Sequence, residues 1–459
     1  MAEHKLIAGH AVRRVRRQLG LTQAAMADAL DISPSYLNLI ERNQRPISAT
    51  LLVRLAERFD FDARTLAASE PGGGRAAMRR RLGDPMFADL DIDRAELDEW
   101  LASAPGGAEA FARAFDARGG EGAGDNPHDR TAREVRRAIE HWRNHFPDLD
   151  AAAEGLADEL RLSSGDLIPA LADRLRTRHQ LSVRILPVEV MPDRLKRLDL
   201  HARQLQLSEL LDPASRAFAM AERLSGEVQG EVDAIVRGAG LSDRVAERLL
   251  RRHVTGYFAA AVMMPYARFL RACEATGYDL ELLQRRFGAG FEQVAHRLTT
   301  LGRVGARGLS FFMLRVDRAG QVSKRYAGAS ASPLVEGGLC PLWDVFAALA
   351  RPGEPMTQLI ETEDGGRWLT IARSVQPHAG PIGGVKGRFA VVVGVAAGEA
   401  AGLAAARGID LGAQAMPVGL GCSACTRPDC SQRSAPPAAR ARIVSDREVG
   451  MTPFAFAGD

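Results

Sequence analysis

The residues best suited to chemistry stand near the end of the chain, in the stretch GCSACTRPDC (421–430). It holds three of the five cysteines in the 459-residue sequence. These three are Cys422, Cys425 and Cys430. Thiolates bind zinc and the iron of iron–sulfur clusters, so three of them on one short loop indicate a metal or redox site. Gly419 and Gly421 permit the sharp backbone turns that such a loop needs.

A fourth thiolate is needed to complete a set of four soft ligands, and the chain offers two candidates. Cys340 stands in GLCPLWDVF, beside a proline, and is the better one. Cys273 stands in FLRACEATG, a helical pattern in which a cysteine packs as a small apolar side chain. A compact triplet plus one remote cysteine is typical of ferredoxin-type ligation, whereas structural zinc usually takes two short Cys-x-x-Cys pairs. The residues favour an iron–sulfur cluster, and zinc or unligated thiols stay open.

Bulk composition narrows the class of protein. At ~150 residues per domain, the chain length predicts two to four domains. An apolar content of 46% and a charged content of 25% indicate a folded globular protein. The sequence has no apolar run long enough to span a membrane and no secretory signal at its N-terminus, so we expect a cytoplasmic protein without a membrane partner. Because the net charge is only +3, nucleic acid would have to bind a local basic patch.

The stretch LGLTQAAMADALDISPSYLNLIERNQRPIS (19–48) predicts two short helices joined by a tight turn. Thr22 and Ser33 are good helix caps, and Pro34 suits the first position of the second helix. Polar side chains near the start of that second helix would project outward, as base-reading side chains do in the major groove. The alternative is a plain helical hairpin with a solvated basic face.

This stretch resembles the helix-turn-helix of the Xre/Cro-like repressor family. The resemblance implies a DNA-binding domain over residues 1–70, and symmetric binding to paired half-sites would need at least a dimer. Arginines on both sides of the two helices add local positive charge for phosphates. The predicted DNA-contacting residues are Thr22, Gln23, Ser33, Ser35, Tyr36, Asn38, Arg42 and Arg45.

The next region, residues 71–129, is predicted to be a linker with a helical segment. Two glycine-rich stretches mark it, PGGGRAAMRRRLG (71–83) and GGEGAGDNPHD (119–129). Residues 94–118 between them have a helical pattern.

Two larger domains are expected after the linker. Residues 130–310 are mainly helical, with a strand pair formed by the alternating stretches 181–187 and 197–208. Residues 311–459 are richer in strands, so the fold class is multidomain, with a mainly α N-terminal half and an α/β or α+β C-terminal domain. The candidate strands are GLSFFMLRVD, PMTQLIET, RWLTIARSV and GRFAVVVGV, and the candidate helices are LWDVFAALA (342–350) and EAAGLAAARG (399–408).

The stretches SRAFAMAERLSGEVQG and YFAAAVMMP resemble the zinc-peptidase-like family that contains the IrrE/ImmA proteins. In that family one helix carries His-Glu-x-x-His, whose histidines bind zinc while the glutamate acts as a base. Aligned from Phe218, this chain has Glu222, Arg223 and Gly226 at those positions, and Val254 near the place of a downstream acidic ligand. We therefore predict no catalytic residue here, but a metal-less shell that forms a ligand-binding domain. A plain dimerisation core is the alternative.

The order of these parts extends the resemblance over nearly the whole chain. A helix-turn-helix, the helical stretch NPHDRTAREVRRAIEHWRNHFPDLDAAAEGLADEL, a degenerate peptidase-like shell and a cysteine-bearing tail resemble the short-chain fatty acyl transcriptional regulators, the PrpR/RamB-like group. The resemblance implies control of genes for acetate, propionate or glyoxylate metabolism, with CoA or a short acyl-CoA as effector. It also implies an iron–sulfur cluster at the tail. We predict a 4Fe-4S cluster, with zinc as the alternative, and the predicted ligands are Cys340, Cys422, Cys425 and Cys430.

A CoA effector needs cations for its phosphates and an apolar slot for its acyl arm. The stretch LLRRHVTGYFAAAVMMPYARF places basic residues beside an apolar helix, and QVSKRY adds two more after an expected strand. The alternative is a solvated basic end on a core helix. The predicted effector-binding residues are Arg251, Arg252, His253, Tyr257, Lys324 and Arg325.

Together these features favour a DNA-binding transcriptional regulator, not an enzyme, gated by acyl-CoA and by a cysteine-ligated cluster. Its expected partners are operator DNA, the acyl-CoA and further copies of the chain, as a dimer or tetramer. A structural-zinc transcription factor, or a redox sensor without a CoA effector, is one alternative. A metallopeptidase acting on a repressor is weaker, because the zinc-binding histidines are missing. A phage-type repressor is also a weaker alternative, because it would give no role to the strand-rich half and the clustered cysteines.

Overall fold

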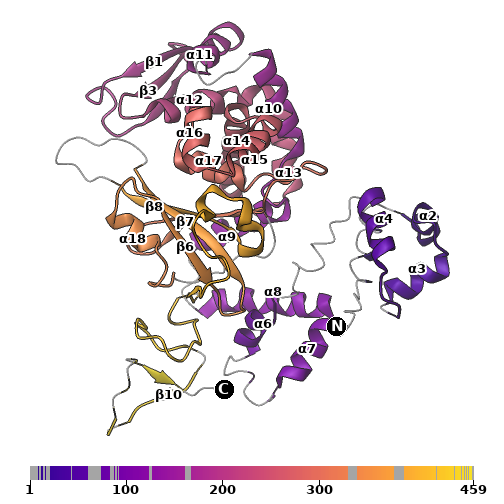
Figure 1. Ribbon diagram of the computed structural model, residues 1–459. Helices are drawn as coiled ribbons and strands as arrows, with labels where there is room; N and C mark the ends of the chain where they lie inside the picture. Colours follow the sequence, from indigo (N-terminus) through magenta and orange to yellow (C-terminus); the bar gives the residue numbers. More distant parts are fainter. Residues whose placement is uncertain are drawn as a thin grey trace. The chain divides into compact units, whose positions relative to one another are not determined.

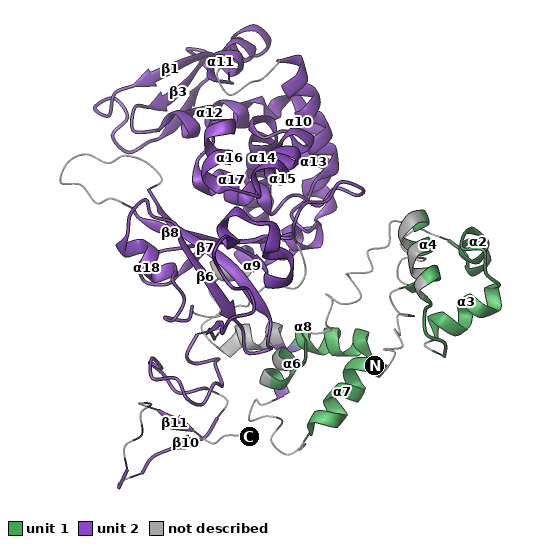
Figure 2. Ribbon diagram, in the orientation of Figure 1, with its two compact units in different colours: residues 1–81, 92–114 green, residues 82–91, 115–459 purple. Residues whose placement is uncertain are grey.

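The structure is a computed structural model in which the chain forms two compact units (Figure 2). Unit 1 comprises residues 1–81 and 92–114, and unit 2 comprises residues 82–91 and 115–459. No helix in the described part of the chain is both long and apolar enough to cross a lipid bilayer. The described residues are 9, 12–13, 16, 21–42, 44–59, 74–82, 87, 90, 92–122, 127–160, 167–328, 339–376, 387–419, 421–438, 440–445, 447–448, 450, 452 and 454–456.

Three short helices of unit 1 form the helix-turn-helix region (Figure 1). They are α2 (Gln23–Ala29), α3 (Pro34–Glu41) and α4 (Ala49–Phe59). Asp31 makes the turn between α2 and α3 in the left-handed region, at φ 56°. Their apolar side chains share one small core, made of Val12, Met26, Ala27, Leu30, Leu37, Ile40, Ile47, Leu51 and Leu55.

The linker predicted over residues 71–83 is wrong for most of its length, because α6 spans Gly74–Leu82. Ala77 and Met78 of α6 are buried, and Arg75 pairs with Asp98 at 2.5 Å. Asp98 lies on α7 (Arg94–Ser103). Alanine and arginine are good helix formers, and here they outweigh the glycine run that precedes them.

The second predicted linker, residues 119–129, is also partly helical. α8 spans Pro105–Gly122 and α9 spans Pro127–His141, while residues 123–126 lie outside the described residues. The helical pattern predicted over residues 94–118 is therefore present as two helices, α7 and α8, which meet near Pro105.

The helical body of unit 2 surrounds one long helix, α14 (Arg244–Met263) (Figure 1). α14 contacts α9, α10, α12, α13 and α17, and the second half of α14 is buried almost throughout. The helices predicted between residues 214 and 301 are thus present. The other elements of the body are α10 (Pro147–Glu159), α11 (Leu167–Arg178), α12 (Pro213–Arg223), η3 (Leu224–Val228), α13 (Gln229–Gly238), α15 (Tyr266–Thr276), α16 (Leu280–Phe287) and α17 (Phe291–Leu298).

A three-stranded sheet packs on this body, in the order β1-β3-β2. β1 (Ser182–Leu186) runs parallel to β3 (Gln204–Ser208), and β2 (Lys196–Asp199) runs antiparallel to β3. The predicted strand pair is therefore three strands, because the stretch 197–208 folds back on itself where Arg203 takes φ 51°. Leu205 and Leu207 of β3 belong to the core of the helical body.

A six-stranded sheet forms the centre of the C-terminal region, in the order β5-β4-β8-β7-β6-β9. Both faces are buried: Val391 and Val393 belong to the core of the helical body, while Val392 packs with Trp343 and with α18 (Val345–Ala350). The four predicted strands are present as β4, β6, β7 and β8. The strands are β4 (Phe312–Val316), β5 (Val322–Ala327), β6 (Met356–Glu361), β7 (Arg367–Val375), β8 (Phe389–Ala396) and β9 (Met416–Pro417).

The helix predicted at residues 399–408 is wrong, because the chain forms two 3-10 turns there. They are η4 (Ala397–Gly402) and η5 (Ala404–Ala406). The backbone N–H of Ala404 donates to the carbonyl of Gly277 at 2.7 Å, and a Cβ on Gly277 would lie 2.8 Å from the Gly402 oxygen. This close contact with the end of α15 fixes a path that a continuous α-helix would not follow.

One ion pair is completely buried in the helical body. Arg297 of α17 donates to Asp150 of α10 at 2.6 Å, and both side chains are fully buried. Arg297 also donates to the Met264 carbonyl at 3.0 Å and to Thr300 Oγ1 at 2.9 Å, and the Tyr257 hydroxyl donates to Asp150 at 2.7 Å. Burial alone would raise the pKa of Asp150, but the charge of Arg297 and the hydrogen bonds hold that pKa below its ordinary value.

Removing one partner of this pair is expected to destabilise unit 2 strongly. Asp150→Asn leaves the Arg297 guanidinium buried without a counter-charge, which costs about 3–5 kcal/mol of unfolding free energy in urea. The matched control is Asp158→Asn, which removes an exposed pair with Arg268 at 2.8 Å and costs at most about 1 kcal/mol. Equal losses in the two variants would show that the buried pair does not organise the body.

Candidate functional site

The helix caps of the predicted DNA-binding region are present. The Thr22 hydroxyl accepts from the backbone N–H of Ala25, and the Ser33 hydroxyl accepts from that of Tyr36, each at 3.1 Å. These bonds fix where α2 and α3 begin, and so which residues of α3 stand at its N-terminal end. Of the predicted contacts, those exposed are Thr22, Ser33, Ser35, Arg42 and Arg45, and those partly exposed are Gln23, Tyr36 and Asn38.

A buried carboxylate ties α2 to α3. Glu41 is fully buried and accepts from Arg16 Nε at 2.6 Å and from Gln23 Nε2 at 2.8 Å. Burial opposes the charge of Glu41, but these hydrogen bonds hold its pKa below the ordinary value. The same Gln23 nitrogen lies 3.3 Å from Asn38 Oδ1. The amide of Gln23 is thus engaged within the domain, where it orients Asn38.

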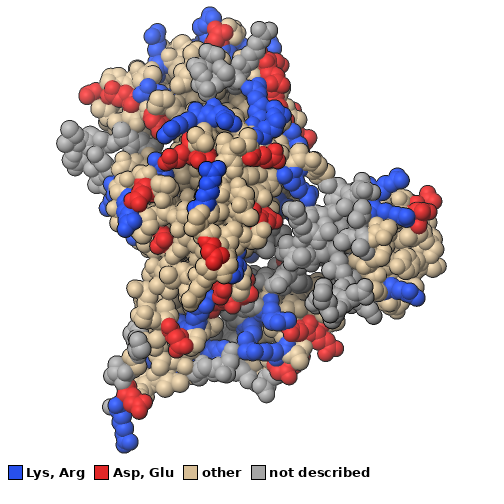
Figure 3. All heavy atoms as spheres, viewed as in Figure 1, with Lys and Arg blue, Asp and Glu red and all other residues tan. Residues whose placement is uncertain are grey.

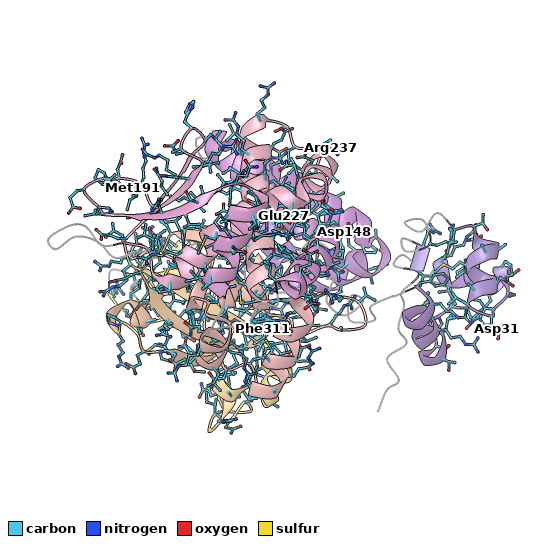
Figure 4. The ribbon with its side chains drawn as sticks, turned by 90° about the horizontal axis from the view of Figure 1, so that it is seen from above. Asp31, Asp148, Met191, Glu227, Arg237 and Phe311 are labelled. Carbon is cyan, nitrogen blue, oxygen red and sulfur yellow. The ribbon has the colours of Figure 1, made fainter. Side chains whose placement is uncertain are left out.

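The helix that aligns with the zinc-binding helix of the peptidases is α12, which ends at Arg223, and Gly226 lies in the 3-10 turn η3 that follows. Glu222 is bound by the ammonium group of Lys196 from β2. Gly226 has no side chain, and the ring of His179 lies 3.7 Å from where its Cβ would stand. Glu227, labelled in Figure 4, accepts from His179 at 2.9 Å. Val254 is fully buried in α14. Lys196 thus pairs with the residue that aligns with the first zinc-binding histidine of the peptidases.

Two histidines from different helices meet in unit 2, in the region predicted to bind the effector. The rings of His253 (α14) and His296 (α17) are 5.6 Å apart, and Tyr326 of β5 lies 5.1 Å from the first and 4.6 Å from the second. Asn144 Oδ1 lies 3.0 Å from His253 Nε2, and Asn144 Nδ2 lies 3.3 Å from His296 Nε2. We call Asn144, His253, His296, Lys324 and Tyr326 the histidine cluster.

The electrostatics of the histidine cluster favour neutral imidazoles beside a surplus of positive charge. Burial, followed by the charge of Lys324, lowers the pKa of His253 to about 3, and burial lowers the pKa of His296 well below its ordinary value. Lys324 lies 2.7 Å from the Glu292 carboxylate, and Arg315 donates to the same oxygen at 3.2 Å. Two cations thus share one carboxylate, which leaves one positive charge to attract an anion.

The structure brings only part of the predicted effector set together. Arg251 pairs with Asp233 of α13 at 2.5 Å, and two positions along a helix turn the side chain by about 200°, so Arg251 faces away from His253. Tyr257 is buried and its hydroxyl is bound to Asp150. Of the remaining predicted residues, Arg252 is exposed on α14, and Lys324 and Arg325 follow the expected strand β4 and lie within β5.

The clustered cysteines lie on an irregular loop that follows β9, and we call residues 419–434 the cysteine loop. Cys425 is buried, Cys422 and Cys430 are partly exposed, and none forms a disulfide. A Cβ on Gly419 would lie 2.5 Å from Cys425 Sγ, so only glycine lets the backbone approach that thiol. Gly421 has φ 91°, a conformation that favours glycine.

The position of Cys340 differs from that of Cys273. Cys340 is buried in the core beneath the six-stranded sheet, beside Val418. Burial raises the pKa of Cys425, and Cys340 is near enough to add to that rise. Cys273 is fully buried on α15, in the core of the helical body, where burial raises the pKa of its thiol. Within the described residues, no three His, Cys, Asp or Glu side chains are gathered as a metal site.

Several of the most constrained residues give no signal in the sequence. Asn144 contacts His296 across 152 positions, and no periodicity connects residues so far apart. The one local hint is the left-handed conformation of Asn144, at φ 51°, which asparagine tolerates better than most residues. Arg433 inside the cysteine loop reads as an ordinary surface arginine, yet it is 3% exposed. Arg297 and Tyr326 were not predicted either, because their contacts are with residues far away in the sequence.

Three family models match successive parts of the chain. A helix-turn-helix model matches residues 12–66, a model described as "IrrE N-terminal-like domain" matches residues 176–299, and one described as "Short-chain fatty acyl coenzyme A regulator, C-terminal" matches residues 300–454.

Three relatives are similar to the chain over nearly its whole length. The chain is 33% identical to the HTH-type transcriptional regulator RamB of Mycobacterium tuberculosis, with 98% of each chain covered. It is 35% identical to the propionyl-CoA carboxylase regulator of Cereibacter sphaeroides, with 98% of each covered. It is 34% identical to the HTH-type transcriptional regulator PrpR of M. tuberculosis, and the match covers 94% of this chain and 92% of the relative.

A solved structure of a Mycobacterium tuberculosis transcriptional regulator matches this fold. Its TM-score is 0.67 at 33% sequence identity, and the match covers 70% of this chain and 98% of that one.

Replacing Asn38 is expected to weaken specific DNA binding. Asn38→Ala removes a side chain that stands on α3 and is oriented by Gln23, so operator affinity should fall by about 1–3 kcal/mol with a relaxed preference at one base pair. Fluorescence anisotropy with operator and non-operator duplexes measures it, and the non-operator affinity, which reports phosphate contacts, is the control. Unchanged operator affinity would remove Asn38 from the reading face.

The neutral histidines predict a pH-dependent stability. In the unfolded chain a histidine has a pKa near ~6.5, whereas folding lowers the pKa of His253 to about 3 and that of His296 well below its ordinary value. The unfolded chain therefore binds more protons below pH ~6.5. The free energy of unfolding is retained above that pH and falls as the pH drops from about 7 to 5, by about 2 kcal/mol for His253, and His296 adds to the fall.

Urea unfolding at both pH values tests this. In the double variant His253→Gln/His296→Gln the fall with pH should be smaller than in the parent. His201→Gln, an exposed residue of the turn between β2 and β3, is the control and should leave the fall unchanged. A double variant that is as sensitive to pH as the parent would refute the assignment.

Proposed function

We propose that this chain, which belongs to the short-chain fatty acyl coenzyme A regulator family, binds operator DNA of genes for short-chain acyl metabolism under control of an acyl-CoA and a cysteine-ligated cluster. The observation that carries the proposal is the similarity over 98% of the chain to proteins named as regulators, together with the three family models that match this chain in succession. One of those relatives is named for propionyl-CoA carboxylase. Propionate-type metabolism is therefore the first set of target genes to examine.

The DNA-binding end would use α3 as the reading helix. Its exposed Ser35 and its half-exposed Asn38 suit base edges, and Arg42 and Arg45 suit phosphates. Lys and Arg are interspersed with Asp and Glu over the described surface seen in Figure 3. Such a surface favours a local basic site over a broad electrostatic one. We propose that the chain acts at least as a dimer, because paired half-sites need two reading helices.

A peptidase role is disfavoured by the geometry of α12. The carboxylate of Glu222 is bound by Lys196, and Arg223 stands where a general base would be needed. An arginine does not accept a proton from water at neutral pH. We propose that this region is a former peptidase shell whose present use is to hold the effector.

The acyl-CoA would bind at the histidine cluster. Lys324 and Arg315 supply positive charge for the phosphates of CoA, with one carboxylate, Glu292, between them. The neutral rings of His253, His296 and Tyr326 remain partly exposed and offer a surface with little charge for the acyl arm. Arg251 is left out of this proposal, because Asp233 already holds it.

A four-iron cluster would be held by Cys340, Cys422, Cys425 and Cys430. The donor set fits, since thiolates are the ligands that such clusters take, and Gly419 lets the backbone pass close to the Cys425 thiol. When bound, a cluster supplies a redox centre and covalent links between segments. The residues of this chain bring Cys340 from beneath the sheet to the neighbourhood of Cys425, and β9 anchors the start of the loop on β6.

Acyl-CoA is expected to stabilise the protein against heat. Acetyl-CoA or propionyl-CoA at a hundredfold excess over Kd should add about 2.7 kcal/mol. Lys324→Gln should reduce the thermal shift, because a phosphate partner is lost. The control Arg351→Gln changes an exposed arginine and should not. The absence of any shift with acetyl-CoA, propionyl-CoA or free CoA would leave the histidine cluster without this role.

The cysteine assignment is tested by colour and metal content after anaerobic purification. Cys425→Ser should lose the charge-transfer absorbance and expose residues 415–435 to protease, because one of four ligands is gone. Cys273→Ser should keep the absorbance of the parent. If Cys273→Ser bleaches the protein while Cys340→Ser stays brown, the fourth ligand is wrong. If the parent contains one zinc and no iron or sulfide, a structural zinc site replaces the cluster.

A further inference from the structure

The centre of the cysteine loop is a buried arginine. Arg433 is 3% exposed, and its Nη1 group donates to the carbonyls of Cys422 at 3.0 Å and Ala435 at 3.3 Å. Its Nη2 group donates to the carbonyls of Arg427 at 2.7 Å and Cys425 at 3.1 Å, and lies 3.8 Å from Cys425 Sγ. One guanidinium thus fixes the backbone on both sides of the first two clustered cysteines.

This guanidinium forms no ion pair with any described carboxylate, although it is charged. Arg297, the other fully enclosed arginine named above, has Asp150 at 2.6 Å. Glu363 lies near the cysteine loop, where its Oε1 accepts from the Thr426 backbone and hydroxyl at 2.8 and 3.0 Å. Its other oxygen, Oε2, is buried without a hydrogen-bond partner in the described part of the chain, and Glu363 forms no ion pair with Arg433. The buried Arg433 Nε has no hydrogen-bond partner in the described part of the chain.

A buried charge without a counter-charge costs several kcal/mol, and carbonyl oxygens compensate only part of that. The thiols of the cysteine loop are groups near Arg433 that are able to become anions, and Cys425 Sγ lies 3.8 Å from its Nη2. A cluster held by four thiolates carries net negative charge, and N–H groups directed at its sulfur atoms stabilise it further. The negative charge of a thiolate-bound cluster would therefore balance the unpaired positive charge of the Arg433 guanidinium.

We propose that Arg433 is the counter-charge of the thiolate-bound cluster and that it sets the reduction potential of the cluster. The inference rests on the proposed cluster and adds the residue that regulates it. Reduction adds one electron to a site that is already negative, and a fixed positive charge nearby makes that step more favourable. Arg433 also lies 4.9 Å over the ring of Phe456 in β11 (Ala455–Phe456), which pairs with β10 (Arg442–Ile443). Arg433 therefore contacts both the cysteine loop and the β10–β11 strand pair.

The experiment compares three variants of the full chain, purified without oxygen. Iron and sulfide content, charge-transfer absorbance and the midpoint potential from a spectroelectrochemical titration are measured in each. Arg433→Gln removes the charge, and its cluster should have a more negative potential than that of the parent. Arg433→Lys keeps the charge, and its potential should stay near that of the parent. The control is Arg442→Gln, which removes an exposed arginine from the same segment and should change nothing.

The outcomes separate this proposal from the cluster itself. An Arg433→Gln protein without cluster beside an Arg433→Lys protein with cluster at the parental potential supports the counter-charge role. Parental potential in Arg433→Gln overturns it while the cluster stands. Equal shifts in the two variants, or loss of cluster in both, overturn it as well, because the hydrogen bonds and not the charge would then matter. If the parent protein contains no iron and no sulfide, the proposed cluster is refuted, and the proposed role of Arg433 is refuted with it.

Discussion

The architecture of unit 2 depends on one buried cation, Arg297. Its guanidinium joins α17 to α10 through Asp150 and to the end of α14 through the Met264 carbonyl, and it lies against the rings of Tyr257 and Tyr266. Because a buried charge tolerates little displacement, these elements hold one arrangement. His296 precedes Arg297 on α17, so the same constraint sets its position in the histidine cluster. The proposed effector site is thus attached directly to the interaction that organises the helical body.

A positive side chain stands at the aligned peptidase position, in the histidine cluster and in the cysteine loop. Lys196 binds Glu222, which aligns with a zinc-binding histidine of the peptidases. Around Lys324 the positive charge exceeds the negative, which suits an anionic effector. Arg433 is buried and forms no ion pair with a described carboxylate, which suits bound thiolates. Each case follows from the cost of leaving a charge unpaired in a protein interior.

Local chemistry explains which features could be predicted from the sequence. The caps at Thr22 and Ser33 and the three clustered cysteines are short-range patterns, and the alternation in the strands of the large sheet is as well. α6 was not predicted, because the glycine run before it indicates a linker, although the arginines that follow favour a helix.

Long-range contacts explain what could not be predicted. The helix expected at residues 399–408 failed because of a backbone contact with Gly277. The set of residues around His253 became visible only when Asn144, His296 and Tyr326 were placed beside it by packing. Arg251 was predicted to bind the effector because it stands near His253 in the sequence, but the helix directs its side chain toward Asp233. Family resemblance supplied the expectation of CoA and a cluster, but not the residues that support them.

The most direct test of the account is the affinity of the cluster-loaded chain for its operator with and without propionyl-CoA. The operator is first selected from random duplexes by the purified protein, and the affinity is then measured at one fixed salt concentration. The account predicts a different Kd when propionyl-CoA is present, and by linkage the same factor in the affinity for propionyl-CoA when DNA is present. It also predicts that Lys324→Gln binds the operator as the parent does, with a smaller response to propionyl-CoA. Equal operator affinity with and without saturating propionyl-CoA would contradict the account.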